Sequence, residues 1–207
     1  MTEFLSLTLI VALSIISPGP DFAVVVRNSL AYGRASACYT ALGIALANLC
    51  HSLINLLGLG VIFTQSQTSF RVMKVVAAFY LVYLGYQGLK ARKNATSTPN
   101  ARQNTKMLIK SHHGFYNGFI TSILNPKAFL FLLSFFAVIL SPQTPLLHQV
   151  AYGFWIASLA GAWFVLVAFV FTSDRMNQKM VALKHWLERI TGGILITIGA
   201  NLLISEI

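Results

Sequence analysis

Two charged residues of opposite sign, Asp21 and Lys127, each follow a proline directly within a long apolar stretch of the sequence. Asp21 ends the motif Ser17-Pro18-Gly19-Pro20-Asp21, and Lys127 ends the motif Asn125-Pro126-Lys127. A proline inside a helix removes a backbone donor and clashes with the preceding turn, so each motif predicts a broken helix. An ionisable residue within a membrane span is by default a candidate functional residue. The two motifs therefore make Asp21 and Lys127 the leading candidates for chemistry.

The chemistry that this pair could perform is recognition of a zwitterion. An α-amino acid carries a carboxylate, which Lys127 would attract, and an ammonium group, which Asp21 would attract. A structural ion pair between the two residues is the alternative, because charges buried in a membrane usually pair. Asp21 is also the best candidate for proton coupling, since burial disfavours the ionised form of a carboxyl group.

The irregular backbone at the two motifs would add to such a site. Half-helices that begin after Pro20 and Pro126 would present unpaired N–H groups and a positive dipole end to an anion. Irregular backbone at membrane depth is tolerated where it lines a wet cavity, so Pro18 and Gly19 are expected at the site too. Asn125 could supply an amide as donor or acceptor.

A polar stripe on the second apolar stretch consists of Asn48, His51 and Asn55, which share one helix face at i, i+3 and i+7. Such residues either bond to a neighbouring helix or line a cavity, and Asn48 counts as a candidate site residue in the second case. His51 has no second histidine or carboxylate at ligand spacing, so no metal site is expected. No cofactor is predicted either.

The elements that must position these residues are membrane-spanning helices. Of the 207 residues, 56% are apolar and 10% are charged, against roughly 25% charged residues in a soluble domain. A spanning helix needs roughly 20 mainly apolar residues. The predicted fold class is therefore an all-α integral membrane protein with six transmembrane helices, the sixth being the weakest. They are expected at about 4–26, 36–63, 72–89, 114–140, 149–172 and 190–205.

The proline motifs also predict an internal repeat. Pro20 and Pro126 lie 106 residues apart. Each half holds three spans, an odd number, so the halves would be inverted relative to each other, with helices 1 and 4 broken by proline. Inverted repeats with broken helices, and a site where the repeats meet, are a common transporter plan. We expect one transmembrane domain over 1–207, with repeat one at 1–93, a basic linker at 94–111 and repeat two at 112–207.

The basic residues predict the orientation and the partners of the chain. Twelve of the 15 Lys and Arg residues follow the first, third and fifth spans, while Arg71 and Lys74 lie on the other side and Lys127 lies within a span. Cytoplasmic loops carry an excess of Lys and Arg, so both termini are predicted to be extracytoplasmic. This distribution favours membrane lipid as a partner over nucleic acid.

Several other classes of protein are disfavoured. No H-E-x-x-H or Gly-x-Ser-x-Gly motif is present, so the protein is not expected to be an enzyme. A thiol-redox carrier would need Cys38 and Cys50 to meet, but twelve residues of helix would separate them by about 18 Å. Small residues spaced by four, at Gly153, Ala157 and Gly161, fit close packing either within the bundle or in a homodimer.

Several motifs, together with the length and the span count, connect the chain to a known family. They are Ser17-Pro18-Gly19-Pro20-Asp21-Phe22, Gly33-Arg34, Gly43, Tyr83-Leu84-Gly85-Tyr86 and Asn125-Pro126-Lys127-Ala128. In these the chain resembles the lysine-exporter (LysE) superfamily, especially its homoserine/threonine-resistance branch of amino-acid exporters. The resemblance covers nearly the whole chain. It implies a bacterial inner-membrane permease that exports amino acids and is driven by the proton gradient.

The resemblance implies a small-molecule amino-acid substrate without fixing which one. The branch that is most similar handles neutral or hydroxylated amino acids such as threonine and homoserine, and export of these is the predicted function. Export of lysine or arginine is an alternative, but a cationic side chain would want a further carboxylate, and only Asp21 falls within a predicted span. A membrane thiol-redox protein or a carrier of another small solute is the remaining alternative.

Overall fold

The computed structural model describes residues 8, 11–65, 67–90, 112–139, 144–171 and 174–206, and this part of the chain is helical without a strand. A helical segment at 11–16 comes first. The longer helices follow in the order α2 (Pro20–Gln65), α3 (Gln67–Leu89), α4 (His113–Ile123), α5 (Pro126–Ile139), α6 (Leu146–Phe171) and α7 (Asp174–Glu206). The linker predicted at 94–111 lies outside the described residues.

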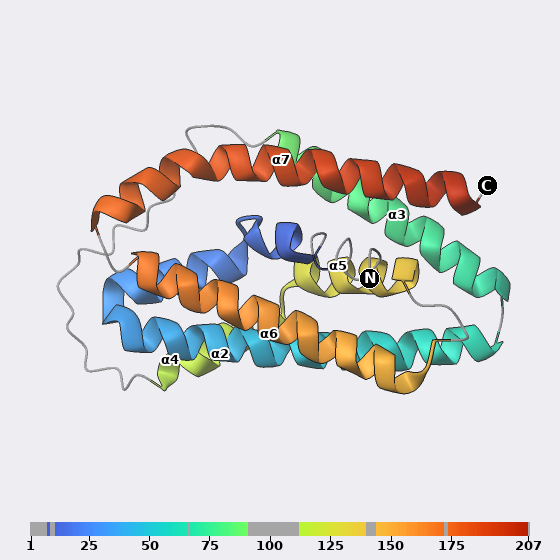
Figure 1. The fold of residues 1–207 in the computed structure, drawn as a ribbon, viewed down its shortest axis with the longest axis horizontal. Helices are drawn as coiled ribbons and strands as arrows, with labels where there is room; N and C mark the ends of the chain where they lie inside the picture. Colours follow the sequence, from blue (N-terminus) through green and yellow to red (C-terminus); the bar gives the residue numbers. More distant parts are fainter. Residues whose placement is uncertain are drawn as a thin grey trace.

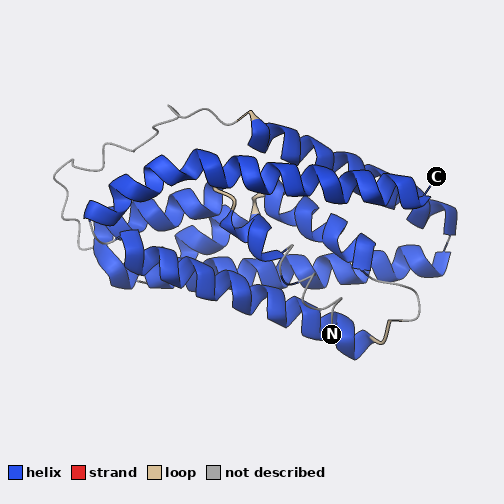
Figure 2. Cartoon of the chain, turned by 45° about the horizontal axis from the view of Figure 1, so that its top comes forward, coloured by secondary structure: helices blue, strands red, loops and turns tan. Residues whose placement is uncertain are grey.

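The helices form an elongated bundle with two sides. α3 and α7 lie against each other along one side, and α2 with α4 and α6 forms the other (Figure 1). α5 lies between the two sides and contacts both α2 and α3. The helical segment at 11–16 runs through the middle as well, so the two helix breaks come to lie at the centre, where Figure 2 shows two short loops side by side.

The first predicted break is confirmed. Helix 11–16 ends at Ser17, whose N–H bonds to the carbonyls of Leu13 and Ser14, and α2 starts at Pro20 with the N–H of Ala23 on the carbonyl of Gly19. Proline offers no N–H to continue the first helix, but it suits the first position of the next, where an N–H would have no partner. The chain therefore stops and restarts its helix within three residues.

α2 consists of two arms that meet at Gly33, the one residue inside it with non-helical torsions (φ 83°, ψ −179°). Figure 1 shows the first arm running to one end of the bundle and the second arm returning along its whole length. The Asn28 side chain donates to Thr40 Oγ1 at 2.8 Å across this turn. A loop of several residues was expected here, but glycine tolerates a backbone conformation that lets a single residue make the turn.

The second predicted break is confirmed as well. α4 and α5 are bent by 59° across Leu124 and Asn125. The Asn125 side chain caps α5, because its Oδ1 accepts the backbone N–H of Lys127 at 3.1 Å. Asn125 therefore both separates the two helices and stabilises the start of the second.

Within the described residues, three helical stretches are long and apolar enough to span a membrane. They are Pro20–Leu59, Arg71–Leu89 and Leu146–Phe171. The bent pair α4–α5 makes a fourth if it is one span. Pro20–Leu59 contains the turn at Gly33. α7 is not among these candidates, so the six-span inverted repeat stays a prediction.

Two boundaries differ from expectation. α7 begins at Asp174, whereas residues before 190 were expected to be a basic loop. α3 begins at Gln67, five residues earlier than predicted. No proline or glycine occurs from Asp174 to Thr191, so nothing local prevents helix through this charged stretch.

Small residues allow close contacts between helices within the chain. A Cβ added to Gly43 would overlap the carbonyl of Phe115, so only glycine lets α2 approach α4 so closely. On α6, Gly153 faces Ser52 and Gly161 faces Ala45, both at 3.2 Å from the position a Cβ would take. The stripe of small residues on α6 therefore packs inside the bundle, which the sequence left open.

Candidate functional site

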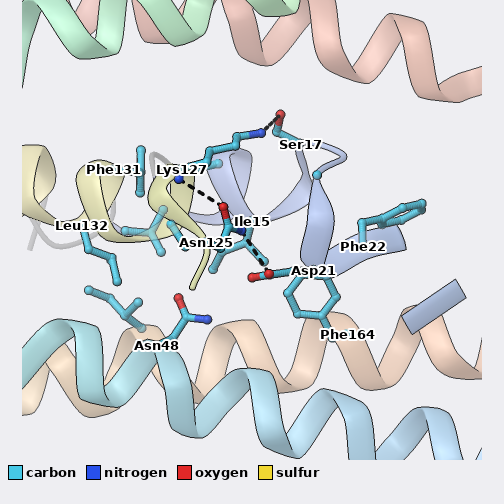
Figure 3. A pocket seen from close by; sticks show the side chains of 15 residues that line it. Ile15, Ser17, Asp21, Phe22, Asn48, Asn125, Lys127, Phe131, Leu132 and Phe164 are labelled. Carbon is cyan, nitrogen blue, oxygen red and sulfur yellow. Dashed lines mark hydrogen bonds between the residues drawn. The ribbon is translucent and has the colours of Figure 1, made fainter. Parts of the chain in front are cut away.

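Asp21 connects the two helix breaks. It begins α2, yet both of its carboxylate oxygens are bound by residues at the other break. Ser122 Oγ, in the last turn of α4, donates to Oδ2 at 2.9 Å. Asn125 Nδ2 donates to Oδ1 at 3.0 Å, as Figure 3 shows. Asp21 is only 8% exposed. A buried carboxylate needs such donors, because an unsatisfied buried charge is very costly. Sequence analysis did not identify Ser122 as part of the site.

Lys127 makes the reciprocal contact. It lies in the first turn of α5, and its ammonium donates to Ser17 Oγ of the first break at 3.0 Å. Each break thus supplies a charged side chain that is bound by polar groups of the other. The two breaks therefore lie together, as expected. Hydrogen bonds between residues that are 101 to 110 positions apart in the sequence connect them.

The structure does not form the ion pair between Asp21 and Lys127 that was the alternative hypothesis. In the described part of the chain, Lys127 donates its side-chain hydrogen bond to a neutral hydroxyl, and the Asp21 oxygens accept from two neutral donors. The physical reason is that Ser122 and Asn125 already satisfy the carboxylate. The Lys127 ammonium is therefore left beside an uncharged partner.

A small cavity of about 50 Å³ lies between the two charges. Its polar lining includes Asp21, Asn125 and Lys127 from the breaks and Asn48 from α2 (Figure 3). A water molecule needs about 10–15 Å³ of such volume, so a few waters fit here and an amino acid does not. The rest of the lining is mainly apolar, with Val11, Ile15, Phe22, Phe131, Leu132, Ile156 and Phe164 among it.

The polar stripe on α2 supports the second break. In an unbroken helix the carbonyl of Ile123 would accept the N–H of Lys127, but that N–H is used by the Asn125 cap. His51 Nε2 takes its place and bonds to the Ile123 carbonyl at 3.1 Å. Asn55 Nδ2 donates to the carbonyl of Phe129 at 3.3 Å. The bonding of His51 and Asn55 to a neighbouring helix is confirmed.

Asn48 has a different position from the other two residues of the stripe. Its amide donates to the Ile44 carbonyl of its own helix at 3.0 Å, and its side chain lines the small cavity. Of the two alternatives for the polar stripe, Asn48 therefore fits the second, in which the side chain lines a cavity.

A larger cavity of about 360 Å³ lies on the other side of the first break. Pro18, Pro20 and Lys127 border it on one side, and residues of α3 and α7 border it on the other. Ligand pockets typically measure about 300–1,000 Å³, so this cavity has room for a small molecule. Gly19 and Lys127 line both cavities, whereas Pro126 lines neither of these two.

Glu188 precedes the predicted sixth span at 190–205, so the sequence places it in or beside the basic segment before that span. In the structure it lies on α7 and lines the larger cavity together with Lys127. The absence of helix breakers from Asp174 to Thr191 was a signal that could have placed it on the helix. Its position beside the first break depends on how α7 packs, which local sequence does not encode.

Apolar helices of membrane-span length, and a charged site where two broken helices meet, define a helical membrane protein with an internal polar site. The chain belongs to the LysE type translocator family, whose family model matches residues 12–206. The resemblance stated from the sequence motifs is thereby confirmed.

The relatives of the chain include characterised and uncharacterised membrane proteins. The Threonine efflux protein of Escherichia coli (strain K12) is 28% identical over 205 residues, covering 98% of each chain. The Threonine efflux protein of Salmonella typhimurium is 27% identical over 210 residues, covering 100% of each. The Leucine efflux protein of Salmonella choleraesuis is 28% identical over 131 residues, covering 63% of this chain and 60% of its own. No solved structure matches the chain.

Proposed function

We propose that this protein exports small neutral amino acids from the cytoplasm by alternating access, coupled to proton entry. The observation that carries the proposal is the reciprocal binding of Asp21 and Lys127 across two crossing helix breaks. Opposite charges held apart at such a site suit the two charged groups of an amino acid. The family and the names of the relatives, which include threonine and leucine efflux proteins, support the same substrate class.

Asp21 is the proposed proton carrier. As an ionised group it accepts from both Ser122 and Asn125. A protonated carboxyl has one O–H donor and less capacity to accept, so one of the two contacts must rearrange on protonation. Because these contacts join the first break to the second, protonation of Asp21 loosens the connection that holds the breaks together. This links proton binding to movement of the helices.

An apolar cluster provides a proposed gate. Phe131, Leu132 and Ile156 wall the small cavity and belong to a buried cluster that joins α2, α3, α5, α6 and α7. Such a cluster excludes water from the charged site as long as it stays packed. Alternating access would require it to open while the larger cavity closes.

The packing also supports the proposed inverted repeat of six spans, 1–93 and 112–207. In that scheme the first span corresponds to α4–α5 and the second arm of α2 corresponds to α6. α4 packs on the second arm of α2, through Gly43 and Phe115. At the level of whole spans the matching contact is that of the first span with α6, where Ser29 Oγ on the first arm of α2 donates to the Ala168 carbonyl at 3.0 Å. This contact is made by the half-helix after the first break, whereas α4 is the half-helix before the second break. α3 and α7, the equivalent third spans, pack on each other.

The proposed orientation in the inner membrane follows from the basic residues, with both termini extracytoplasmic. A reporter fused after Ile207 should be active if it works outside the cytoplasm. Activity of a reporter that works only in the cytoplasm would contradict the orientation.

The deciding experiment for the function is counterflow into proteoliposomes with purified protein and a panel of labelled amino acids. We expect exchange of threonine, homoserine or another neutral amino acid, and its loss in Lys127→Ala protein that still inserts and purifies as a folded species. Exchange of lysine or arginine instead would keep the transport class and overturn the neutral substrate. No exchange with any amino acid, from protein shown to be folded, would refute amino-acid export. Dependence of the rate on an imposed pH gradient tests proton coupling.

A further inference from the structure

We propose that the cavity of about 360 Å³ between the first break and the α3–α7 pair is the site where the amino acid binds from the cytoplasm. In this site Lys127 binds the carboxylate and Glu188 binds the ammonium group. The inference rests on the proposed export of amino acids. It reassigns the ammonium-binding role from Asp21, which holds that role in the sequence analysis and in the proposed function, to Glu188.

The charges of the cavity match a zwitterion. Lys127 lies on the wall made by the breaks and Glu188 lies on α7, so a cation and an anion border one space. In the described part of the chain Lys127 bonds to Ser17 Oγ and forms no ion pair with either carboxylate. A substrate carboxylate can therefore replace a neutral hydroxyl at Lys127 without first breaking an ion pair.

Asp21 is not available to this cavity. Both of its oxygens accept hydrogen bonds from the second break, and it lines the small cavity and not the larger one. Among the described residues that line the larger cavity, Glu188 is the one that carries a carboxylate. A division of labour follows, in which Glu188 recognises the substrate and Asp21 responds to protons.

The remaining lining sets the class of side chain that fits. Leu84 and Leu195 are apolar, and Gln87 and Thr191 offer uncharged polar groups. With one carboxylate facing one ammonium, no further anion remains among the described lining residues for a cationic side chain. The site therefore suits a small amino acid with an apolar or hydroxylated side chain.

The position of the cavity points to the cytoplasmic side. Gln87 and Gly88 line it from the last turn of α3, which ends at Leu89. The basic stretch that begins at Lys90 follows directly in the sequence. Under the positive-inside rule this end of α3 lies at the cytoplasm. The substrate would then enter next to Gln87 and reach Lys127 before it meets Phe131, Leu132 and Ile156 of the small cavity.

The test compares binding of L-threonine with that of its analogue 2,3-dihydroxybutyrate, which has a hydroxyl in place of the ammonium group. Wild-type protein should prefer threonine. In Glu188→Gln protein this preference should fall by about tenfold or more, because a hydrogen bond to a charged group is lost, while binding of the analogue stays the same. Glu188→Asp should restore part of the preference. Arg189→Gln, an exposed neighbour on the same helix, is the matched control and should keep the full preference.

A second measurement decides the matter even if Glu188→Gln does not fold. Gln87→Cys, in a Cys38→Ser/Cys50→Ser background, should react with a charged thiol reagent added from the cytoplasmic side, and threonine should slow the reaction. Unchanged threonine preference in Glu188→Gln, or no protection of Gln87→Cys by threonine, overturns this inference while wild-type exchange of threonine leaves the proposed function intact. If the wild type exchanges no amino acid, the proposed function itself fails.

Discussion

At the break before α2, three residues without helical geometry separate two helical segments, whereas at the break before α5 only Leu124 and Asn125 do so. The second break is stabilised where it stands. Its own Asn125 caps α5. His51 bonds to the carbonyl of Ile123, which has lost its helical partner at the break. The first break has no comparable local support for Asp21, whose partners are all on the second break.

This difference indicates which break is the fixed one. The second break is bound to the long arm of α2 by His51 and Asn55, so it forms the scaffold of the site. The first break is held to that scaffold mainly through side chains, and it also borders the larger cavity. We therefore expect the first break to move during transport, and variants can test each half of this comparison.

The largest effect is expected from Asp21→Asn. A carboxamide offers one oxygen and an NH₂ group, so it cannot accept from both Ser122 and Asn125 as the carboxylate does. We expect transport to fall by about a hundredfold, the scale of losing strong hydrogen bonds to a charged group. Counterflow should be measured beside membrane level and size-exclusion profile, with Thr197→Val on the exposed face of α7 as control. Normal export by the Asp21→Asn protein would contradict the proposed role of Asp21 in proton coupling.

Asn125 variants separate the two tasks of this side chain. Asn125→Ala removes both the cap of α5 and the donor to Asp21, and we expect about a tenfold loss of transport together with lower thermal stability. Serine is a good capping residue but is too short to replace the amide at Asp21. Asn125→Ser should therefore recover thermal stability in detergent without recovering transport. Equal recovery of both would show that the contact with Asp21 has no separate role.

His51→Ala tests whether the second break is a scaffold. It leaves the partly buried Ile123 carbonyl without the His51 contact, and the loss of a partner from a fully buried group would cost about 1–3 kcal/mol. We expect a lower unfolding temperature and a transport rate within about threefold of wild type, since His51 lines neither cavity described above. His51→Gln, whose amide can donate to the same carbonyl, is the matched variant. Loss of transport in a protein with unchanged stability would contradict the scaffold role.

The smallest effect on transport is expected at the turn of α2, which lies away from both breaks. Gly33→Ala places a Cβ on a backbone with φ 83°, a region that side chains disfavour. Strain of this kind costs about 1–3 kcal/mol of stability. Thermal unfolding should therefore shift while the affinity for threonine stays unchanged. A changed affinity would show that the two arms of α2 transmit movement to the site.

Much of the site could be predicted because its signals are local. The prolines beside Asp21 and Lys127 break their helices by their own covalent structure, wherever the chain packs. The contact of Asp21 with Ser122 could not be predicted. Ser122 is one of many hydroxyl residues, and nothing in the neighbouring sequence distinguishes it from the others. Glu188 was misplaced because charges before an apolar span were taken for a loop, although the helix runs on through them.

By itself, the sequence determined the helical class, the two breaks and the charge at each of them. Apolar length, proline geometry and residue charge act over a few neighbouring residues, so they can be read without a fold. The tertiary structure alone decided that Asp21 binds the second break and that Glu188 faces Lys127 across a cavity. These contacts join residues far apart in the chain, and they depend on how closely glycine and other small residues let whole helices approach.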